Sequence, residues 1–277
     1  TRIVNFAHGE IIAFGAMMTV FFSSSPDSSL LFLDIYSPLG INFFISTIIS
    51  IVLCGIFGGS LELFLFRPLR KNNFGNIAVL VVTIGLSIFL RHLYLLFASA
   101  KPSSFVLELQ RREDYFGVQL TPRNVQVLTI GFIVMILVGV FLSYTKTGKA
   151  MRAVRDSTDL ANVSGINSDY IILVTWIFSS MLAGFTGIIQ GVINNVRWNM
   201  GFLILLLIFA GTVLGGIGTS FGAMFGGFAI GVLVQLSVAL EFMEGHTEAK
   251  NAIALALMIF ILLIRPQGIF GKQDRIS

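Results

Sequence analysis

The chain has 277 residues, of which 55% are hydrophobic and only 12% charged, and its mean hydropathy is +0.89. A soluble core of this length does not need so many apolar residues, so the composition indicates a protein that crosses a membrane several times. The net charge of +4 is modest, and no nucleic-acid partner is expected from it.

Apolar runs long enough to cross a bilayer, which takes about 20 residues, follow one another along the chain. The first run, Gly9 to Phe22, could start as early as Asn5. The further predicted spans cover residues 41–66, 77–98, 125–145, 170–196 and 251–264, and residues 198–240 hold two spans that are joined near Gly215. We therefore expect an all-α fold, a polytopic bundle of seven to eight transmembrane helices in a single domain over residues 1–277. Because the chain starts with Thr1 and an apolar run follows almost at once, we also expect one more native span ahead of it.

Lysine and arginine are unevenly distributed between the loops. Loops 67–73, 145–169 and 265–277 fall on one side of the membrane and hold ten of these residues, while the opposite side holds six. Since basic loops stay in the cytoplasm, the first set is predicted to be cytoplasmic and loop 23–40 external. Loop 101–124 carries charges of both signs, and we expect a small hairpin or an amphipathic segment there.

Residues 145–169, which we name the charged loop, separate two uncharged apolar runs. Its first half is rich in helix-favouring residues, and Lys149, Arg152 and Asp156 would share one face of that helix. A second short helical turn is predicted from Asp159, ended by Gly165 in a left-handed conformation. A structured, charged loop of this kind indicates a contact with a cytosolic protein, and a solvated connector is the alternative.

Several polar side chains interrupt the apolar runs. Asn5, His8 and Glu10 lie at the entrance of the first span, either on a solute path or between helices, or at the interface in contact with water and headgroups. Glu62 is predicted to pair with Arg67 or Arg70. For Arg91 and His92, near the outer end of the third span, we expect side chains that extend to the membrane surface.

Glycine residues are concentrated between residues 211 and 231. Several of these glycines recur every four residues and would form a stripe on one side of a helix. Such a stripe predicts close helix packing, because small residues let helix backbones approach each other in lipid. The members of this stripe are Gly218, Gly222, Gly226, Gly227 and Gly231. Gly215, Gly216 and Gly218 would also break the helix, and such a break is tolerated where protein or a cavity covers the freed backbone.

The motifs of common enzymes are missing from the sequence. No P-loop, no H-E-x-x-H and no G-x-S-x-G occurs. The single cysteine, Cys54, and three histidines do not suggest a metal site. We therefore expect neither an enzyme nor a cofactor, and any energy from ATP would have to come from another chain.

Short segments along the whole chain match the motifs of one family. They are Asn5 to Glu10 (NFAHGE), Arg67 to Arg70, Ile84 to Ile88, Thr147 to Ala153, Gly165 to Asn167, Val213 to Gly218, Gly222-Ala223, Gly226-Gly227 and Arg265 to Ile269. On these segments the chain resembles the permeases of branched-chain amino acid ABC transporters, the Liv type. The resemblance lacks only the usual N-terminal span.

This resemblance implies a permease subunit in the cytoplasmic (inner) membrane of a bacterium. Its implied partners are ABC ATPase subunits, a second homologous permease, a periplasmic solute-binding protein and the lipid bilayer. The charged loop is similar to the family's coupling loop, which contacts the ATPase. The residues expected to take part are Arg152, Asp156, Asp159, Ala161, Gly165 and Ile166. Ala161 and Gly165 are one helical turn apart, so we expect them to face the ATPase together.

The expected solute is small and polar. Branched-chain or neutral amino acids are favoured, urea and short amides are the alternatives within the family, and an ion-coupled secondary transporter is the alternative outside it. Phe221 stands where the family has proline, and Leu207 where relatives often carry lysine. The uncharged run 201–209 fits a neutral or zwitterionic solute, but these departures leave its identity open.

Overall fold

The computed structural model describes residues 5–23, 41–72, 74–98, 101–105, 111, 113–115, 118–216 and 220–238, together with single positions at 256, 259, 260 and 263. By its internal contacts the chain divides into two compact units, Thr1–Gly201 and Phe202–Ser277. The sequence predicts a single domain, and each unit is described by itself below.

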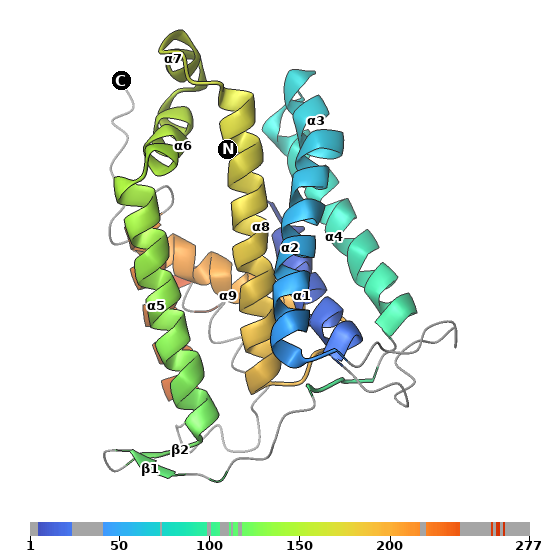
Figure 1. Cartoon of the computed structure of the whole chain (residues 1–277). Helices are drawn as coiled ribbons and strands as arrows, with labels where there is room; N and C mark the ends of the chain where they lie inside the picture. The colour runs from blue at the N-terminus through green and yellow to red at the C-terminus, as the bar shows by residue number, and fades with distance from the viewer. Residues whose placement is uncertain are drawn as a thin grey trace. The chain divides into compact units, whose positions relative to one another are not determined.

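Helices account for most of the described residues (Figure 1). The first unit contains α1 (His8–Ser23), α2 (Phe43–Leu61), a π-helical turn η1 (Glu62–Phe66), α3 (Arg67–Lys71), α4 (Asn76–Ala98), α5 (Pro122–Tyr144), α6 (Lys146–Asp156), α7 (Thr158–Val163) and α8 (Ser168–Ile193). Helix α9 (Met200–Gly215) starts at the boundary between the units, and α10 (Ser220–Val238) follows. Two short strands, β1 (Glu113–Tyr115) and β2 (Val118–Leu120), form an antiparallel hairpin, one of the two structures expected in loop 101–124.

Four helical segments are long and apolar enough to cross a membrane: Phe43–Lys71, Ile77–Phe97, Pro122–Tyr144 and Ser168–Ile193. Three shorter apolar helices are His8–Ser23, Met200–Gly215 and Phe221–Leu236. These helices confirm the prediction of an all-α, multi-pass membrane bundle. Loop 23–40, most of the predicted span 251–264 and the tail after it lie outside the described residues.

Pro68 explains the π-helical turn between α2 and α3. Proline has no amide hydrogen, so the carbonyl of Phe64, four residues earlier, cannot receive its usual helical hydrogen bond. The amide of Arg67 instead donates to the carbonyl of Glu62, five residues back. The helix therefore continues with one wider turn, and the basic residues of α3 extend the second span.

Helices α1, α2 and α8 form the core of the first unit, where the backbones of α1 and α8 touch and α2 packs closely on α8. A methyl group on Gly15 would overlap the backbone of Gly184, and one on Gly187 would overlap the carbonyl of Ile12. Likewise, Gly58 of α2 lies directly against the side chain of Ser180. Since lipid provides no hydrophobic drive for helix association, such close approaches supply the van der Waals contact that holds the helices together.

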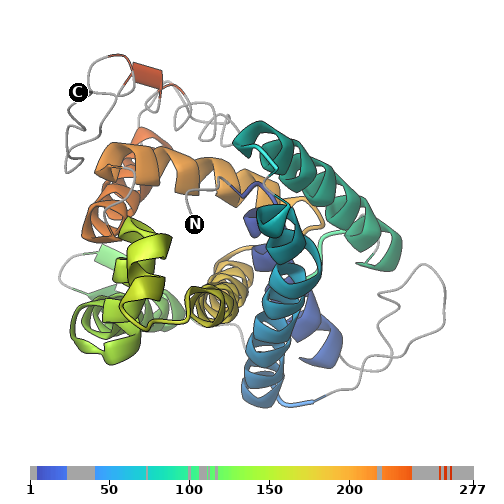
Figure 2. The ribbon, with the colours of Figure 1, turned by 90° about the horizontal axis from the view of Figure 1, so that it is seen from above.

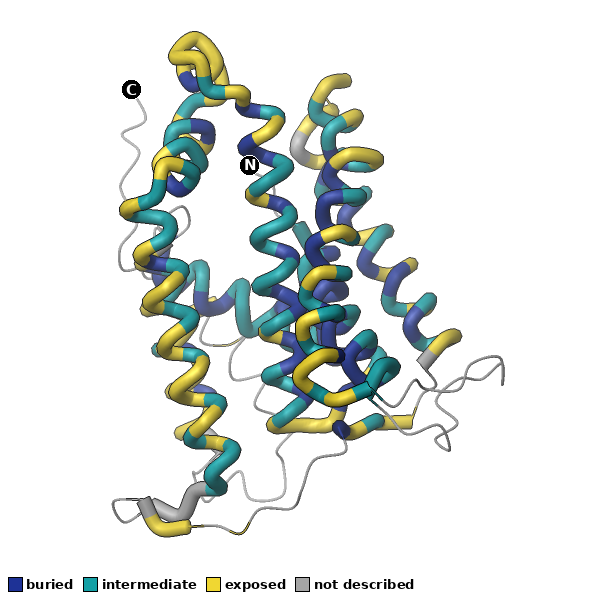
Figure 3. The backbone as a smooth tube through the Cα atoms, in the orientation of Figure 1, coloured by how far each residue is buried: buried dark blue, intermediate teal, exposed yellow. Residues whose placement is uncertain are grey.

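Burial follows the same arrangement: buried residues gather where α1, α2 and α8 meet, whereas α5 is covered little by its own chain (Figure 3). Viewed from above, α5 and α4 lie on opposite sides of this core (Figure 2). Helix α5 meets α8 through the stacked rings of Phe141 and Phe178, whose centroids are 4.7 Å apart. Large apolar side chains on the outer faces, such as Phe64 and Ile77, are exposed as expected for lipid contacts.

In the second unit, α9 and α10 pack through part of the glycine series. Gly216 has a φ of +102° and ends α9, so the predicted break is present. Methyl groups on Gly211 or Gly215 would overlap the backbone of α10, and one on Gly226 would overlap α9. Gly222 contributes its carbonyl to this contact.

The predicted stripe is only partly correct. Among the described residues, no atom lies within 4 Å of a methyl group placed on Gly227 or Gly231. Gly227 approaches α9 with its backbone Cα and N, and Gly231 is exposed. The physical reason is that residues 222 and 226 share a face, while 227 and 231 lie one residue further around the helix. Gly218 lies outside the described residues.

The contact between α1 and α8 predicts a specific sensitivity. Replacing Gly187 with alanine should lower the melting temperature of the purified protein in detergent, because the added methyl group forces the two backbones apart. Overpacking of this kind costs about 1–3 kcal/mol. In the control Gly131→Ala, on α5, the methyl group meets no atom within 4 Å and should be harmless. Equal melting temperatures of the two variants would contradict the backbone contact.

Candidate functional site

Each helix of the charged loop starts at a residue whose side chain accepts a backbone hydrogen bond. The Thr145 hydroxyl accepts from the amide of Gly148 at 3.0 Å and starts α6. The Ser157 hydroxyl accepts from Leu160 at 3.3 Å and starts α7. These N-caps, each contributing about 1 kcal/mol, explain how a short polar loop holds two helices.

Gly165 ends α7 in the way that the sequence predicts. It has a φ of +82°, a conformation that side chains other than glycine rarely adopt. After it, the amide of Ile166 donates to the carbonyl of Ala161 at 3.0 Å and closes the helix end.

The structure contradicts the expected orientation of Ala161. This residue is buried in an apolar cluster, which we name the loop cluster, and does not face outward with Gly165. The loop cluster consists of Phe66, Val79, Val154, Ala161, Ile171, Ile172 and Trp176. Ile166 also packs against it. Ala161 is small because α7 lies close to α8, and spacing within the loop cannot reveal this contact with a distant segment.

Two apolar side chains that the sequence analysis did not identify face outward from α7. Leu160 is 69% exposed and Val163 is 87% exposed, and they are three residues apart on one face of the helix. Asp159 lies exposed beside them. Leu160 and Val163 therefore form a small exposed apolar patch on the outer side of α7.

The charged residues of α6 are exposed, as their predicted common face requires. Asp156 pairs with its neighbour Arg155 at 2.7 Å. Arg152 donates to the carbonyl of Ser143, at the end of α5, at 3.2 Å. The first of these contacts lies within α6, and the second ties α6 to the end of α5.

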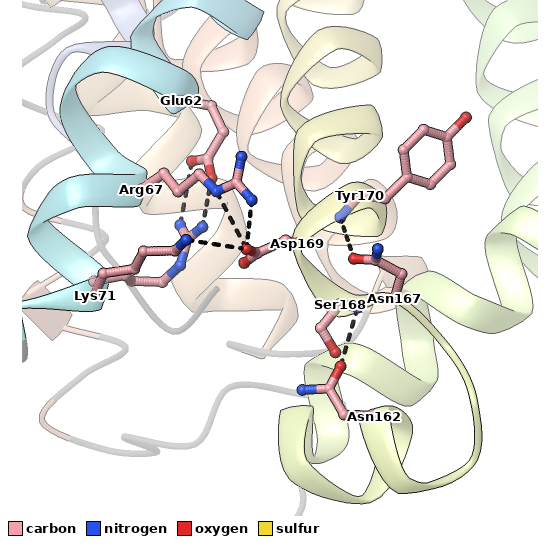
Figure 4. A network of polar contacts seen from close by, with 9 residues as sticks. Glu62, Arg67, Lys71, Asn162, Asn167, Ser168, Asp169 and Tyr170 are labelled. Atoms are coloured by element: carbon pink, nitrogen blue, oxygen red, sulfur yellow. Dashed lines mark hydrogen bonds and ion pairs between the residues drawn. The ribbon is translucent and has the colours of Figure 1, made fainter.

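Ion pairs join the charged loop to the end of the second span (Figure 4). The Arg67 guanidinium donates twice to Oδ2 of Asp169, at 2.7 and 3.2 Å, and the Lys71 ammonium lies 3.8 Å from the same atom. Glu62 is bound by Arg70, one of the two partners predicted for it, while Arg67, the other, binds Asp169. Loops 67–73 and 145–169 therefore meet at one end of the unit, as expected for loops on one side of a membrane.

A second polar cluster lies between α1 and α4, and we name it the Glu10 cluster (Glu10, Ser87, Arg91 and Tyr94). Oε1 of the fully buried Glu10 accepts from the Ser87 hydroxyl at 2.9 Å and from Nε and Nη2 of Arg91 at 3.1 and 3.0 Å. The Tyr94 hydroxyl donates to the backbone carbonyl of Glu10 at 3.1 Å.

The prediction that Arg91 extends to the membrane surface is wrong, because this ion pair holds its side chain 84% buried. Its partner lies 81 residues away in the sequence, so the local pattern carried no signal of the pair.

The other expected pathway residues lie close to these elements. Oδ1 of Asn5 accepts from the amide of Ala7 at 3.0 Å and its carbonyl accepts from the amide of His8 at 3.3 Å, which fixes the start of α1. His8 is the first residue of that helix. Gly215 and Gly216 belong to the second unit, at the end of α9. Among the residues that the structure describes, no group of three His, Cys, Asp or Glu side chains could hold a metal ion.

The sequence matches the model of a protein family described as branched-chain amino acid transport system / permease component, over residues 1–262. It is 30% identical over 280 residues to LivH, the high-affinity branched-chain amino acid transport system permease protein, of Salmonella typhimurium and of Escherichia coli (strain K12). Each match covers 98% of this chain and 86% of the relative. BraD of Pseudomonas aeruginosa, with the same description, is 31% identical over 98% of this chain and 87% of its own. No solved structure matches the chain.

The burial of Ala161 gives a testable distinction within α7. Ala161→Glu should lower the amount of folded protein in the membrane, because it places bulk and an unpaired charge inside the loop cluster. We expect a loss of more than about 3 kcal/mol. Val163→Glu adds the same group to an exposed position and should leave the amount unchanged. If both variants accumulate like the wild type, Ala161 does not support the loop from within.

Proposed function

Because the chain belongs to the family of branched-chain amino acid transport permeases, we propose that it is the permease subunit of an ATP-driven importer for branched-chain or other neutral amino acids. Both compact units then act as parts of one permease domain. The protein itself is not an enzyme. ATP hydrolysis takes place on separate ABC ATPase subunits, since the chain has no P-loop.

The observation that carries this proposal is the exposed apolar pair on α7. Leu160 and Val163 dock into a groove of the ATPase, and Asp159 and the charges of α6 lie at the rim of the contact. Buried apolar side chains contribute most of the energy of such a contact, and rim charges mainly orient it. Ala161, Gly165 and Ile166 then act indirectly, because they hold α7 in place.

The loop cluster can transmit a movement of α7 to the helices that cross the membrane. Phe66, at the end of the π-helical turn, stacks on Trp176 of α8 with ring centroids 4.5 Å apart. Ala161 packs in the same cluster. A displacement of α7 by the ATPase would therefore move η1, at the end of the second span, together with α8. The pair between Arg67 and Asp169 is about 40% exposed, so it contributes less than about 1 kcal/mol and breaks readily when the helices move.

The remaining partners follow from the family. A second homologous permease stands beside this chain in the bilayer, and a periplasmic binding protein delivers the solute from the other side. The location is the inner membrane of a bacterium, with the charged loop in the cytoplasm. The excess of lysine and arginine on that side, ten against six, supports this orientation.

Docking through α7 can be tested with Val163→Glu and Leu160→Glu. Each variant should reach the membrane at the wild-type level but lose ATP-driven uptake of leucine, isoleucine and valine, because a charge replaces the apolar contact. Co-purification of the ATPase should weaken as well. Val163→Ile keeps the contact apolar and should retain uptake. Wild-type uptake by both glutamate variants would rule out α7 as the docking element. If the wild-type complex takes up urea or short amides and no amino acids, the proposed solute is wrong.

The orientation has its own test. In a Cys54→Ala background, a cysteine at the exposed position Ser164 should be shielded from an impermeant thiol reagent added outside intact cells. A cysteine at Ser104, which is exposed near the opposite end, should react. The reverse labelling pattern would place the charged loop outside and remove the basis of the ATPase contact.

A further inference from the structure

The two oxygens of the Glu10 carboxylate have unequal surroundings. Oε1 receives three hydrogen bonds, from Ser87 and from two nitrogens of Arg91. Oε2 is equally buried, and among the described residues no donor reaches it. In the usual fork geometry a guanidinium binds both oxygens of a carboxylate, so the arrangement here leaves one oxygen for another donor.

The position of the Glu10 cluster makes this oxygen unusual. At about 1.5 Å per residue, Arg91 lies about 22 Å from the first residue of α4 and about 10 Å from the last, well inside a membrane span. Water cannot readily satisfy an oxygen at that depth, and an unpaired polar atom in such a place is costly and typical of functional sites.

Charged groups lie on one side of Oε2 of Glu10 and apolar rings lie on another. Besides the ion pair, the first turn of α1 presents the partial positive charge of a helix N-terminus. Next to it, Phe14 stacks on Phe57 with ring centroids 4.9 Å apart and lies 6.3 Å from the ring of Tyr94. A solute with charged groups at one end and an apolar side chain at the other matches both parts.

We propose that Oε2 of Glu10 binds the α-ammonium group of the transported amino acid when α1 and α4 separate during the cycle. This inference rests on the proposed function and adds the group that recognises the solute. The carboxylate of the solute then lies toward the start of α1, and its apolar side chain lies against Phe14, Phe57 and Tyr94. Since Glu10 and Arg91 are neutral as a pair, a zwitterion enters without adding net charge to the membrane interior, whereas a simple cation or anion would add one.

The test must separate recognition from a purely structural ion pair. The double variant Glu10→Gln with Arg91→Gln removes both charges, and its two amides can still hydrogen-bond across α1 and α4. Neutral replacement of a buried ion pair often leaves stability unchanged. The variant is assembled with its ATPase and binding protein in membrane vesicles, and ATP-driven leucine uptake and the melting temperature are both measured. Gly131→Ala, on α5, is the control, because its added methyl group meets no atom within 4 Å and lies outside the Glu10 cluster.

The double variant should melt close to the wild type and lose leucine uptake by about tenfold or more, the size expected when a charge-assisted hydrogen bond to the solute is removed. Gly131→Ala should retain uptake. If the double variant imports leucine like the wild type, or melts far below Gly131→Ala, the Glu10 cluster only holds α1 and α4 together and the inference is wrong. If the wild-type complex itself imports a solute without an ammonium group, the proposed solute fails first and this inference with it.

Discussion

Glycine residues bring the backbones of α1 and α8 into direct contact and let α2 pack closely on α8, and other elements of the first unit are held against these helices. The contact depends on the absence of side chains at Gly15, Gly184 and Gly187. In lipid no hydrophobic force draws helices together, so this close approach, with its many van der Waals contacts, takes the place of a soluble core. It also fixes where the polar groups lie, since α8 starts from the charged loop and α1 carries Glu10.

Both polar sites are attached to this core at its edges. At one end the loop cluster fastens α7 to η1, α4 and α8. Inside the membrane the Glu10 cluster ties α4 to α1. In the proposed mechanism, a movement that begins at α7 reaches α2 and α8 first, and then α1 through the glycine contacts. Because packed helices shift as units and do not deform continuously, a small displacement at the charged loop can separate α1 from α4.

Features encoded by neighbouring residues could be predicted from the sequence. The apolar runs predicted the spans, Gly165 predicted the end of α7, and Glu62 pairs with Arg70, one of its two predicted partners. The prediction failed where the partner is distant in the chain. Arg91 is bound by a carboxylate 81 residues away, and Ala161 is buried against other segments that no local pattern identifies. The outward side of α7, with Leu160 and Val163, could not be predicted either, because it depends on which side of the helix distant segments bury.

In the proposed function, ATP acts through a separate subunit to drive amino acid import through this chain. This function can be tested by measuring the uptake of leucine, isoleucine and valine into vesicles that contain the complete complex, with and without an ionophore that collapses ion gradients. We expect uptake that requires ATP and the binding protein and is unchanged by the ionophore. Uptake that proceeds without ATP and disappears with the ionophore would contradict the proposed function, and would assign the chain to the ion-coupled secondary transporters.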